Sequence, residues 1–122
     1  MQIIRLHHAQ ITIPIGAESE AKAFYCGLLG LDEIPKPESL RSRGGFWLQV
    51  GDRQVHVGVE ERSPNFKTKA HLAYEVDDIT SWREALSKNA FEVIAGELIP
   101  GYNRFEIRDP FGNRVEFIQP MG

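Results

Sequence analysis

Residues 6–13, LHHAQITI, alternate in polarity as a half-buried β-strand does, and residues 70–76, AHLAYEV, repeat this pattern. Each stretch is followed by a segment with helical periodicity. The first helix is expected from about Glu18 to Leu29, where apolar residues recur at i, i+3, i+4 and i+7, and the second from Asp77 or Asp78 to near Asn89. The chain therefore contains the succession of strand and helix twice.

Further strand signals follow each expected helix, and a tight turn joins the last two strands of each half. These signals are GGFWLQV (44–50) and RQVHVGV (53–59) in the first half, and YNRFEIR (102–108) and RVEFIQ (114–119) in the second. The predicted fold class is α+β, with two tandem βαβββ modules over residues 1–61 and 68–120 of a single domain, 1–122. Each module leaves one sheet face uncovered, so the two mixed sheets are expected to pair around a cavity.

The composition narrows the class of function. A chain of 122 residues is long enough for one domain with its own core. The single cysteine, Cys26, excludes an intrachain disulfide and is expected to be inert. No secretory signal and no apolar run of membrane-spanning length is recognised, which predicts a cytoplasmic protein without membrane contact. The formal net charge of -3 lacks the basic excess of nucleic-acid binders, so a small-molecule partner is expected.

Four polar side chains stand at equivalent positions of the two modules. His8 and His71 open the first strand of each module, and His56 and Glu116 lie on the last strand. Strand phase places His8 on the cavity side and His7 on the packing side. Three imidazoles and one carboxylate that meet at one centre would suit a divalent zinc, nickel, cobalt, manganese or iron ion.

Each of these residues taken singly is also compatible with a structural role, since Glu116, for example, has Arg104 and Arg114 nearby in the sequence. Candidates for substrate binding are arginines, which clamp a carboxylate or phosphate, and aromatic residues of the strands. These candidates are Arg43, Arg104, Phe46 and Tyr102. The alternative for the arginines is a solvated surface position, and for the aromatic residues it is the core.

The motifs LHHAQITI, FYCGLLGLDEI, QVHVGV, AHLAYEVDDI and DPFGNRVEFIQ, in this order, resemble the vicinal oxygen chelate superfamily. That superfamily includes glyoxalase I, methylmalonyl-CoA epimerase, fosfomycin-resistance thiol transferases, extradiol dioxygenases and bleomycin-binding proteins. The resemblance covers nearly the whole chain and implies a metal held by His8, His71 and Glu116. At the fourth position glyoxalase I and the epimerase usually carry Glu or Gln, and this chain has His56. The resemblance further implies a homodimer and proton transfer by His56 or Glu116.

Three functions follow from these expectations. The first is a glyoxalase-like metalloenzyme, a lyase or isomerase, whose small substrate chelates the metal through two neighbouring oxygens. The second is an iron-dependent extradiol-type dioxygenase that uses the face formed by His8, His71 and Glu116. The third is a metal-free protein that sequesters a small molecule such as an antibiotic.

Overall fold

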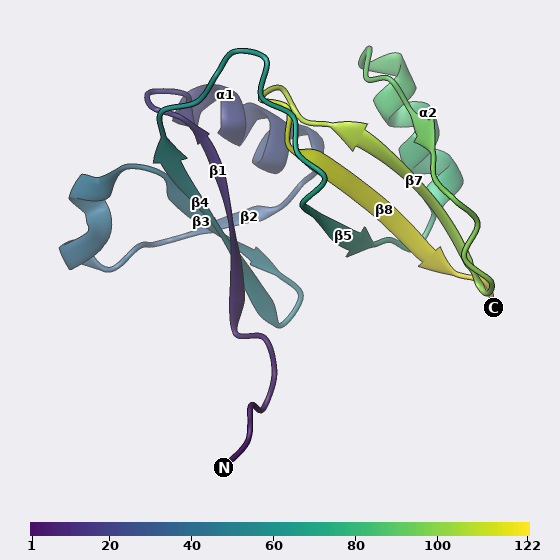
Figure 1. The fold of residues 1–122 in the computed structure, drawn as a ribbon, viewed down its shortest axis with the longest axis horizontal. Coiled ribbons are helices and arrows are strands. Elements are labelled where there is room, and N and C mark those ends of the chain that lie inside the picture. The colour runs from purple at the N-terminus through teal and green to yellow at the C-terminus, as the bar shows by residue number, and fades with distance from the viewer. The chain divides into compact units, whose positions relative to one another are not determined.

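Each half of the chain folds into its own four-stranded mixed sheet (Figure 1). The computed structural model describes residues 1–122, and these divide into unit 1, residues 1–64, and unit 2, residues 65–122. Both units have the order strand, helix and three strands. The predicted α+β class with two tandem βαβββ modules is therefore confirmed.

The sheet of unit 1 has the strand order β1-β4-β3-β2, in which β1 is parallel to β4 and the other pairs are antiparallel. Its strands are β1 (His8–Pro14), β2 (Asp32–Ile34), β3 (Phe46–Val50) and β4 (Arg53–Glu60). Between β1 and β2 the chain forms helix α1 (Glu18–Lys22), which continues as a π-helical turn, η1 (Ala23–Leu28). A 3-10 helix, η2 (Glu38–Arg43), precedes β3.

The two faces of this sheet differ in chemistry because side chains alternate along each strand. One face belongs to the core, and its buried residues are Phe46, Leu48, Val55 and Val57. The Lys22 ammonium lies 5.4 Å from the centroid of the Phe46 ring, so α1 covers this face. The opposite face is polar, and the register pairs both Gln10 and Trp47 with His56 on it.

Unit 2 repeats this arrangement with the strand order β5-β8-β7-β6, in which β5 is parallel to β8. Its elements are β5 (His71–Glu75), α2 (Ile79–Lys88), β6 (Ile94–Ala95), β7 (Tyr102–Arg108) and β8 (Arg114–Pro120). The Asp78 carboxylate accepts hydrogen bonds from the backbone N–H and the hydroxyl of Ser81, and so caps α2. This helix therefore begins where the sequence predicts.

Helix α2 covers the apolar face of the unit 2 sheet (Figure 1). The centroids of the Trp82 and Phe117 rings are 5.6 Å apart, and Phe117 stacks on Phe105 at 5.0 Å. Leu86 of the same helix is fully buried. The opposite face of the sheet carries charged residues, among them Arg104, Glu106 and Glu116.

The structure departs from the predicted elements at the start of the chain, and it locates two short strands whose positions the sequence does not indicate. The first strand begins at His8, so His7 precedes it and is exposed, with its Nδ1 3.1 Å from Nδ1 of His8. The packing position predicted for His7 is therefore wrong. Strands β2 and β6 have three and two residues, too few for a periodic signal in the sequence. None of the helices has the length and apolar character needed to cross a membrane.

Candidate functional site

In unit 2, His71 and Glu116 contact each other from the neighbouring parallel strands β5 and β8. The register pairs Glu116 with Ala73, two residues after His71, so both side chains rise from the same face of the sheet. His71 Nε2 lies 3.1 Å from Glu116 Oε1. The structure thus brings together two of the four residues that the sequence predicts as metal ligands.

The hydrogen bonds of His71 determine which groups face each other in this pair. Its Nδ1 lies 2.9 Å from the Lys69 carbonyl oxygen, and because a carbonyl only accepts, Nδ1 carries a proton. In the neutral ring, Nε2 then presents a lone pair to the carboxylate, which also only accepts. Two acceptors at 3.1 Å need a cation between them, either a second imidazole proton or a metal ion.

The pair fits a divalent metal ion in donor type and in spacing. Two ligand atoms that lie about 2.1 Å from an ion, at about 90° to each other, are about 3.0 Å apart. The hydrogen bond from Nδ1 to a backbone carbonyl is the usual support of a metal-ligating histidine. Neither unit brings three or more His, Cys, Asp or Glu side chains together. Unit 2 therefore provides two candidate ligands, and an ion held there would need others.

Arg104, on the neighbouring strand β7, holds the Glu116 carboxylate. Its Nε donates to Oε2 at 3.1 Å and its Nη2 donates to Oε1 at 2.9 Å, a bidentate ion pair. These hydrogen bonds and the arginine charge lower the pKa of Glu116, although burial acts to raise it. Arg114 pairs with Glu106 instead. Glu116 is therefore a fixed anion, and Arg104 is its partner.

In unit 1, three aromatic rings stack across strands β3, β4 and β1. The ring centroids of Trp47 and His56 are 3.8 Å apart with nearly parallel planes, and those of His56 and His8 are 4.1 Å apart. The order of the strands sets the order of the rings, so His56 lies in the middle. Its two ring faces are covered, and the residue is 7% exposed.

His56 is held as a neutral imidazole. Its Nε2 lies 2.9 Å from Gln54 Oε1, and with the amide oxygen as acceptor this nitrogen carries the proton. Burial first, and then the neighbouring His8, His7 and Lys36, lower the pKa of His56 below the ordinary value of 6.5. The unprotonated nitrogen, Nδ1, is therefore available to accept a proton near neutral pH.

The stack also bears on whether His8 and His56 bind one metal ion together. The lone pair of an imidazole nitrogen lies in the plane of the ring, so the lone pairs of two stacked rings run side by side and do not converge. The planes of His8 and His56 are inclined by only 19°. As a pair these histidines do not fit a shared ion in this arrangement, and the prediction that His56 is a fourth ligand requires its ring to leave the stack.

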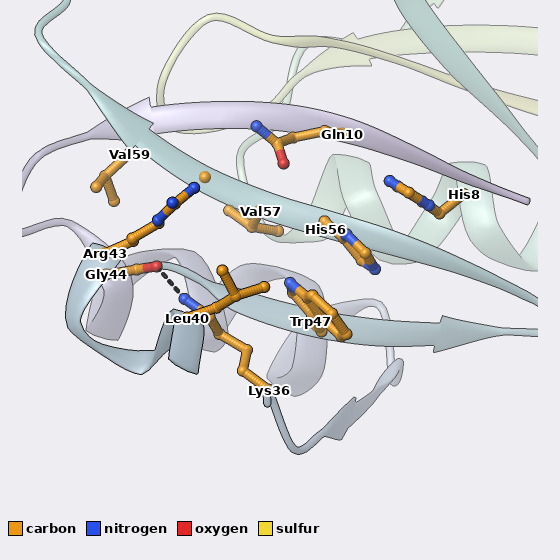
Figure 2. A pocket seen from close by; sticks show the side chains of 11 residues that line it. His8, Gln10, Lys36, Leu40, Arg43, Gly44, Trp47, His56, Val57 and Val59 are labelled. Carbon is orange, nitrogen blue, oxygen red and sulfur yellow. Dashed lines mark hydrogen bonds between the residues drawn. The ribbon is translucent and has the colours of Figure 1, made fainter. Parts of the chain in front are cut away.

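A cavity of about 470 Å³ lies over the polar face of the unit 1 sheet (Figure 2). This volume is within the range of small-molecule sites. His8, His56 and Trp47 line the cavity from the sheet, and Lys36, Leu40 and Arg43 line it from the segment around η2. Figure 2 shows the indole nitrogen of Trp47 directed toward the interior.

The four residues predicted to bind substrate have different surroundings. Arg43 lines the unit 1 cavity. Phe46 does not, because it alternates with Trp47 along β3 and points into the core, where it is 1% exposed. Arg104 is engaged by Glu116, and Tyr102 at the start of β7 is 42% exposed. Of the four, Arg43 is the one that lines the unit 1 cavity.

Gln10 and Lys36 line the cavity although the sequence analysis does not identify them as site residues. Gln10 shares the strand phase of His8, and that phase is the signal that indicates it. Lys36 lies in an irregular stretch before η2, where no periodicity assigns a direction to its side chain. Its place at the cavity depends on the path of that segment.

A family profile described as Glyoxalase/Bleomycin resistance protein/Dioxygenase superfamily matches residues 5–117. A glyoxalase family protein from Bacillus anthracis is 41% identical over 99% of this chain and 98% of its own, with a TM-score of 0.90. Lactoylglutathione lyase from Agrobacterium tumefaciens is 18% identical over 94% of this chain and 92% of its own, with a TM-score of 0.72. The fosfomycin resistance protein FosX from Mesorhizobium loti is 14% identical over 98% of this chain and 95% of its own, with a TM-score of 0.70. No curated protein matches the sequence.

Proposed function

We propose that this chain, which belongs to the Glyoxalase/Bleomycin resistance protein/Dioxygenase superfamily, is a metal-dependent lyase or isomerase for a small substrate with two neighbouring oxygens. The observation that carries the proposal is the contact of His71 with Glu116, because its facing acceptor atoms need a cation. His8 stays the further ligand that the sequence predicts. The metal is zinc, nickel, cobalt, manganese or iron, which suit imidazole and carboxylate ligands.

Neighbouring residues fix the orientation of the two proposed metal ligands, His71 and Glu116. The Lys69 carbonyl fixes the tautomer and the orientation of His71, and Arg104 fixes the Glu116 carboxylate from the other side. Both supports exist before a substrate arrives, so little reorganisation is needed during the reaction. A divalent ion bound there would polarise a substrate oxygen or activate a water molecule.

We assign the proton-transfer step to His56 in preference to Glu116. An efficient general base has a pKa near the working pH. Glu116 is a weak base, because both of its oxygens accept hydrogen bonds from Arg104 and its pKa is lowered. The pKa of His56 is also lowered, but from an ordinary value of 6.5, and the neutral ring lines the cavity of unit 1 and keeps Nδ1 free for a proton.

An extradiol-type dioxygenase is the second candidate. His8, His71 and Glu116 are the residue types of the two-histidine, one-carboxylate face that ferrous iron uses with dioxygen. A metal-free binding protein is the third candidate, and in that function the contact between His71 and Glu116 would have a purely structural role.

Turnover with individual metals tests the proposal. The full chain is stripped with a chelator, reconstituted with zinc, nickel, cobalt, manganese or ferrous iron, and incubated with small α-hydroxyketones in D₂O. Proton exchange or rearrangement, followed by NMR, should depend on the metal and be lost in His71→Ala and His56→Gln. Oxygen consumption with catechols, confined to the ferrous protein, would support the dioxygenase instead. Turnover that is unchanged in His71→Ala would contradict both metal-dependent functions.

The homodimer and the cytoplasmic location expected from the sequence stay predictions. Light scattering on the purified chain measures the first, because a dimer has twice the mass of 13.8 kDa that the sequence gives. The assembly matters to the proposed function, since two-module relatives commonly work as homodimers in the family that the sequence resembles.

A further inference from the structure

The side chains that line the unit 1 cavity are rich in hydrogen-bond donors and include no carboxylate. Lys36 and Arg43 contribute two positive charges, and Gln10 and Trp47 contribute neutral N–H groups. The chain as a whole has 17 Asp and Glu residues and a formal net charge of -3. The cavity is therefore a positively charged region of a negatively charged protein.

The two cations of the cavity are not neutralised by ion pairs. Lys36 Nζ donates to the backbone carbonyl of Gly44 at 2.5 Å, which is an uncharged partner. Arg43 forms no ion pair, and in Figure 2 its guanidinium extends over β4 toward Gln10. Lys36 also contributes to the lowered pKa of His56, after burial and the two neighbouring histidines. Lysine and arginine side chains that are not paired with a carboxylate of the protein can bind an anionic ligand.

Two glycines allow close approach of the chain at the cavity floor. A Cβ on Gly58, in β4, would lie 2.9 Å from Gln10 Nε2, so the absence of a side chain there makes room for the amide. Gly45 approaches β4 so closely, with φ of +78°, that a Cβ would overlap the Val57 carbonyl. Gly45 therefore brings the end of the η2 segment, which carries Arg43 two residues earlier, close to the sheet.

We propose that this cavity binds the anionic group of a small molecule, a carboxylate or a phosphoryl group, with Arg43 as its principal ligand. Lys36 and the indole N–H of Trp47 supply the supporting donors. Leu40 and Val59 provide an apolar wall, so the ligand also has a short apolar body. That the ligand is the substrate rests on the proposed function, whereas the binding itself uses residues of unit 1.

Nitrogen-15 NMR of the full chain observes this site directly, because the sequence has only two tryptophans. Trp47 lines the cavity, whereas Trp82 packs on Phe117 in unit 2 and serves as an internal control. The probes are benzoate, phenylphosphonate and uncharged benzamide at constant pH and ionic strength. We expect at least one anion to shift the Trp47 indole signal with an affinity about tenfold or more above that of benzamide, and the Trp82 signal to stay in place.

Three variants distinguish an anion site formed by Arg43 from a general charge effect and from anion capture by a metal ion. Arg43→Gln should weaken anion binding about tenfold or more. Arg5→Gln makes the same charge change at an exposed residue that precedes β1 and lies outside the cavity lining, and should weaken binding by less than about threefold. His71→Ala should leave anion binding unchanged, because His71 belongs to the proposed metal site and not to this cavity. Metal content, measured separately, reports on the proposed function alone.

Each outcome decides between defined alternatives. A response to benzoate alone assigns a carboxylate ligand, a response to phenylphosphonate alone assigns a phosphoryl ligand, and a response to both assigns the shared anion chemistry. The proposal is overturned if Trp47 does not respond, if benzamide binds as well as the anions, or if Arg43→Gln binds them normally. Loss of binding in His71→Ala but not in Arg43→Gln would likewise overturn it.

Discussion

His71 Nε2 lies 3.1 Å from Glu116 Oε1, while His71 Nδ1 donates its proton to the Lys69 carbonyl. Because Nδ1 carries the proton of a neutral ring, Nε2 has a lone pair that faces the Glu116 carboxylate. A hydrogen bond between a neutral His71 and an ionised Glu116 is thereby excluded. The cation that this contact needs is either a proton or a metal ion, and the proposed function requires the metal ion.

Arg104→Leu is expected to destabilise the protein by about 2–4 kcal/mol, because it leaves the buried Glu116 carboxylate without its bidentate partner. Urea denaturation at pH 7 measures this loss. Arg53→Leu is the matched control, since Arg53 pairs with the exposed Asp52 and its removal should change the stability by less than about 1 kcal/mol. Equal effects of the two substitutions would show that Glu116 does not depend on Arg104.

Gly45→Ala is expected to destabilise the protein by more than about 2 kcal/mol, because the new methyl group meets the Val57 carbonyl at a positive φ. Gly51→Ala provides the comparison. Gly51 also has a positive φ, +59°, but a Cβ there has no atom within 4 Å, so the loss should be only about 1 kcal/mol. Thermal unfolding of both variants tests whether close approach, and not backbone conformation alone, demands Gly45.

The cap of α2 should make part of the stability depend on pH. Hydrogen bonds from Ser81 lower the pKa of Asp78 below its ordinary value of 3.8. A lowered carboxyl pKa stabilises the folded state above the ordinary value, and this contribution disappears as the pH falls through the folded pKa. In Asp78→Asn the cap does not titrate, so the stability difference from the wild type should shrink between about pH 7 and about pH 2.5. Urea denaturation of both proteins at the two pH values measures this difference. A difference that is the same at both pH values would contradict the role of the Asp78 carboxylate in the cap.

The sequence predicts the repeated fold because its signals are local. Alternation along LHHAQITI and AHLAYEV identifies the strands that carry His8 and His71, and Asp78 marks the start of α2. The βαβββ pattern includes strands β2 and β6, but the sequence does not locate them because two or three residues hold no period. The elements that carry the candidate site are therefore the ones that the sequence defines well.

The contacts within the site depend on strand register, which the sequence does not contain. Arg104 and Arg114 are equally plausible partners of Glu116 in the sequence, and the pairing of Glu106 opposite Glu116 decides between them. The stack of Trp47, His56 and His8 likewise requires the strand order β1-β4-β3.

Metal content per chain tests the proposed metal site most directly. The untagged protein, purified without chelator and reconstituted with one divalent metal at a time, is analysed by elemental mass spectrometry beside His71→Ala and His7→Ala. His7 is the matched control, because it is an exposed histidine that precedes β1. We predict a near-stoichiometric metal that is lost in His71→Ala and retained in His7→Ala. No bound metal under any condition, or equal metal in His71→Ala, would contradict the metal site and leave a proton as the cation between His71 and Glu116.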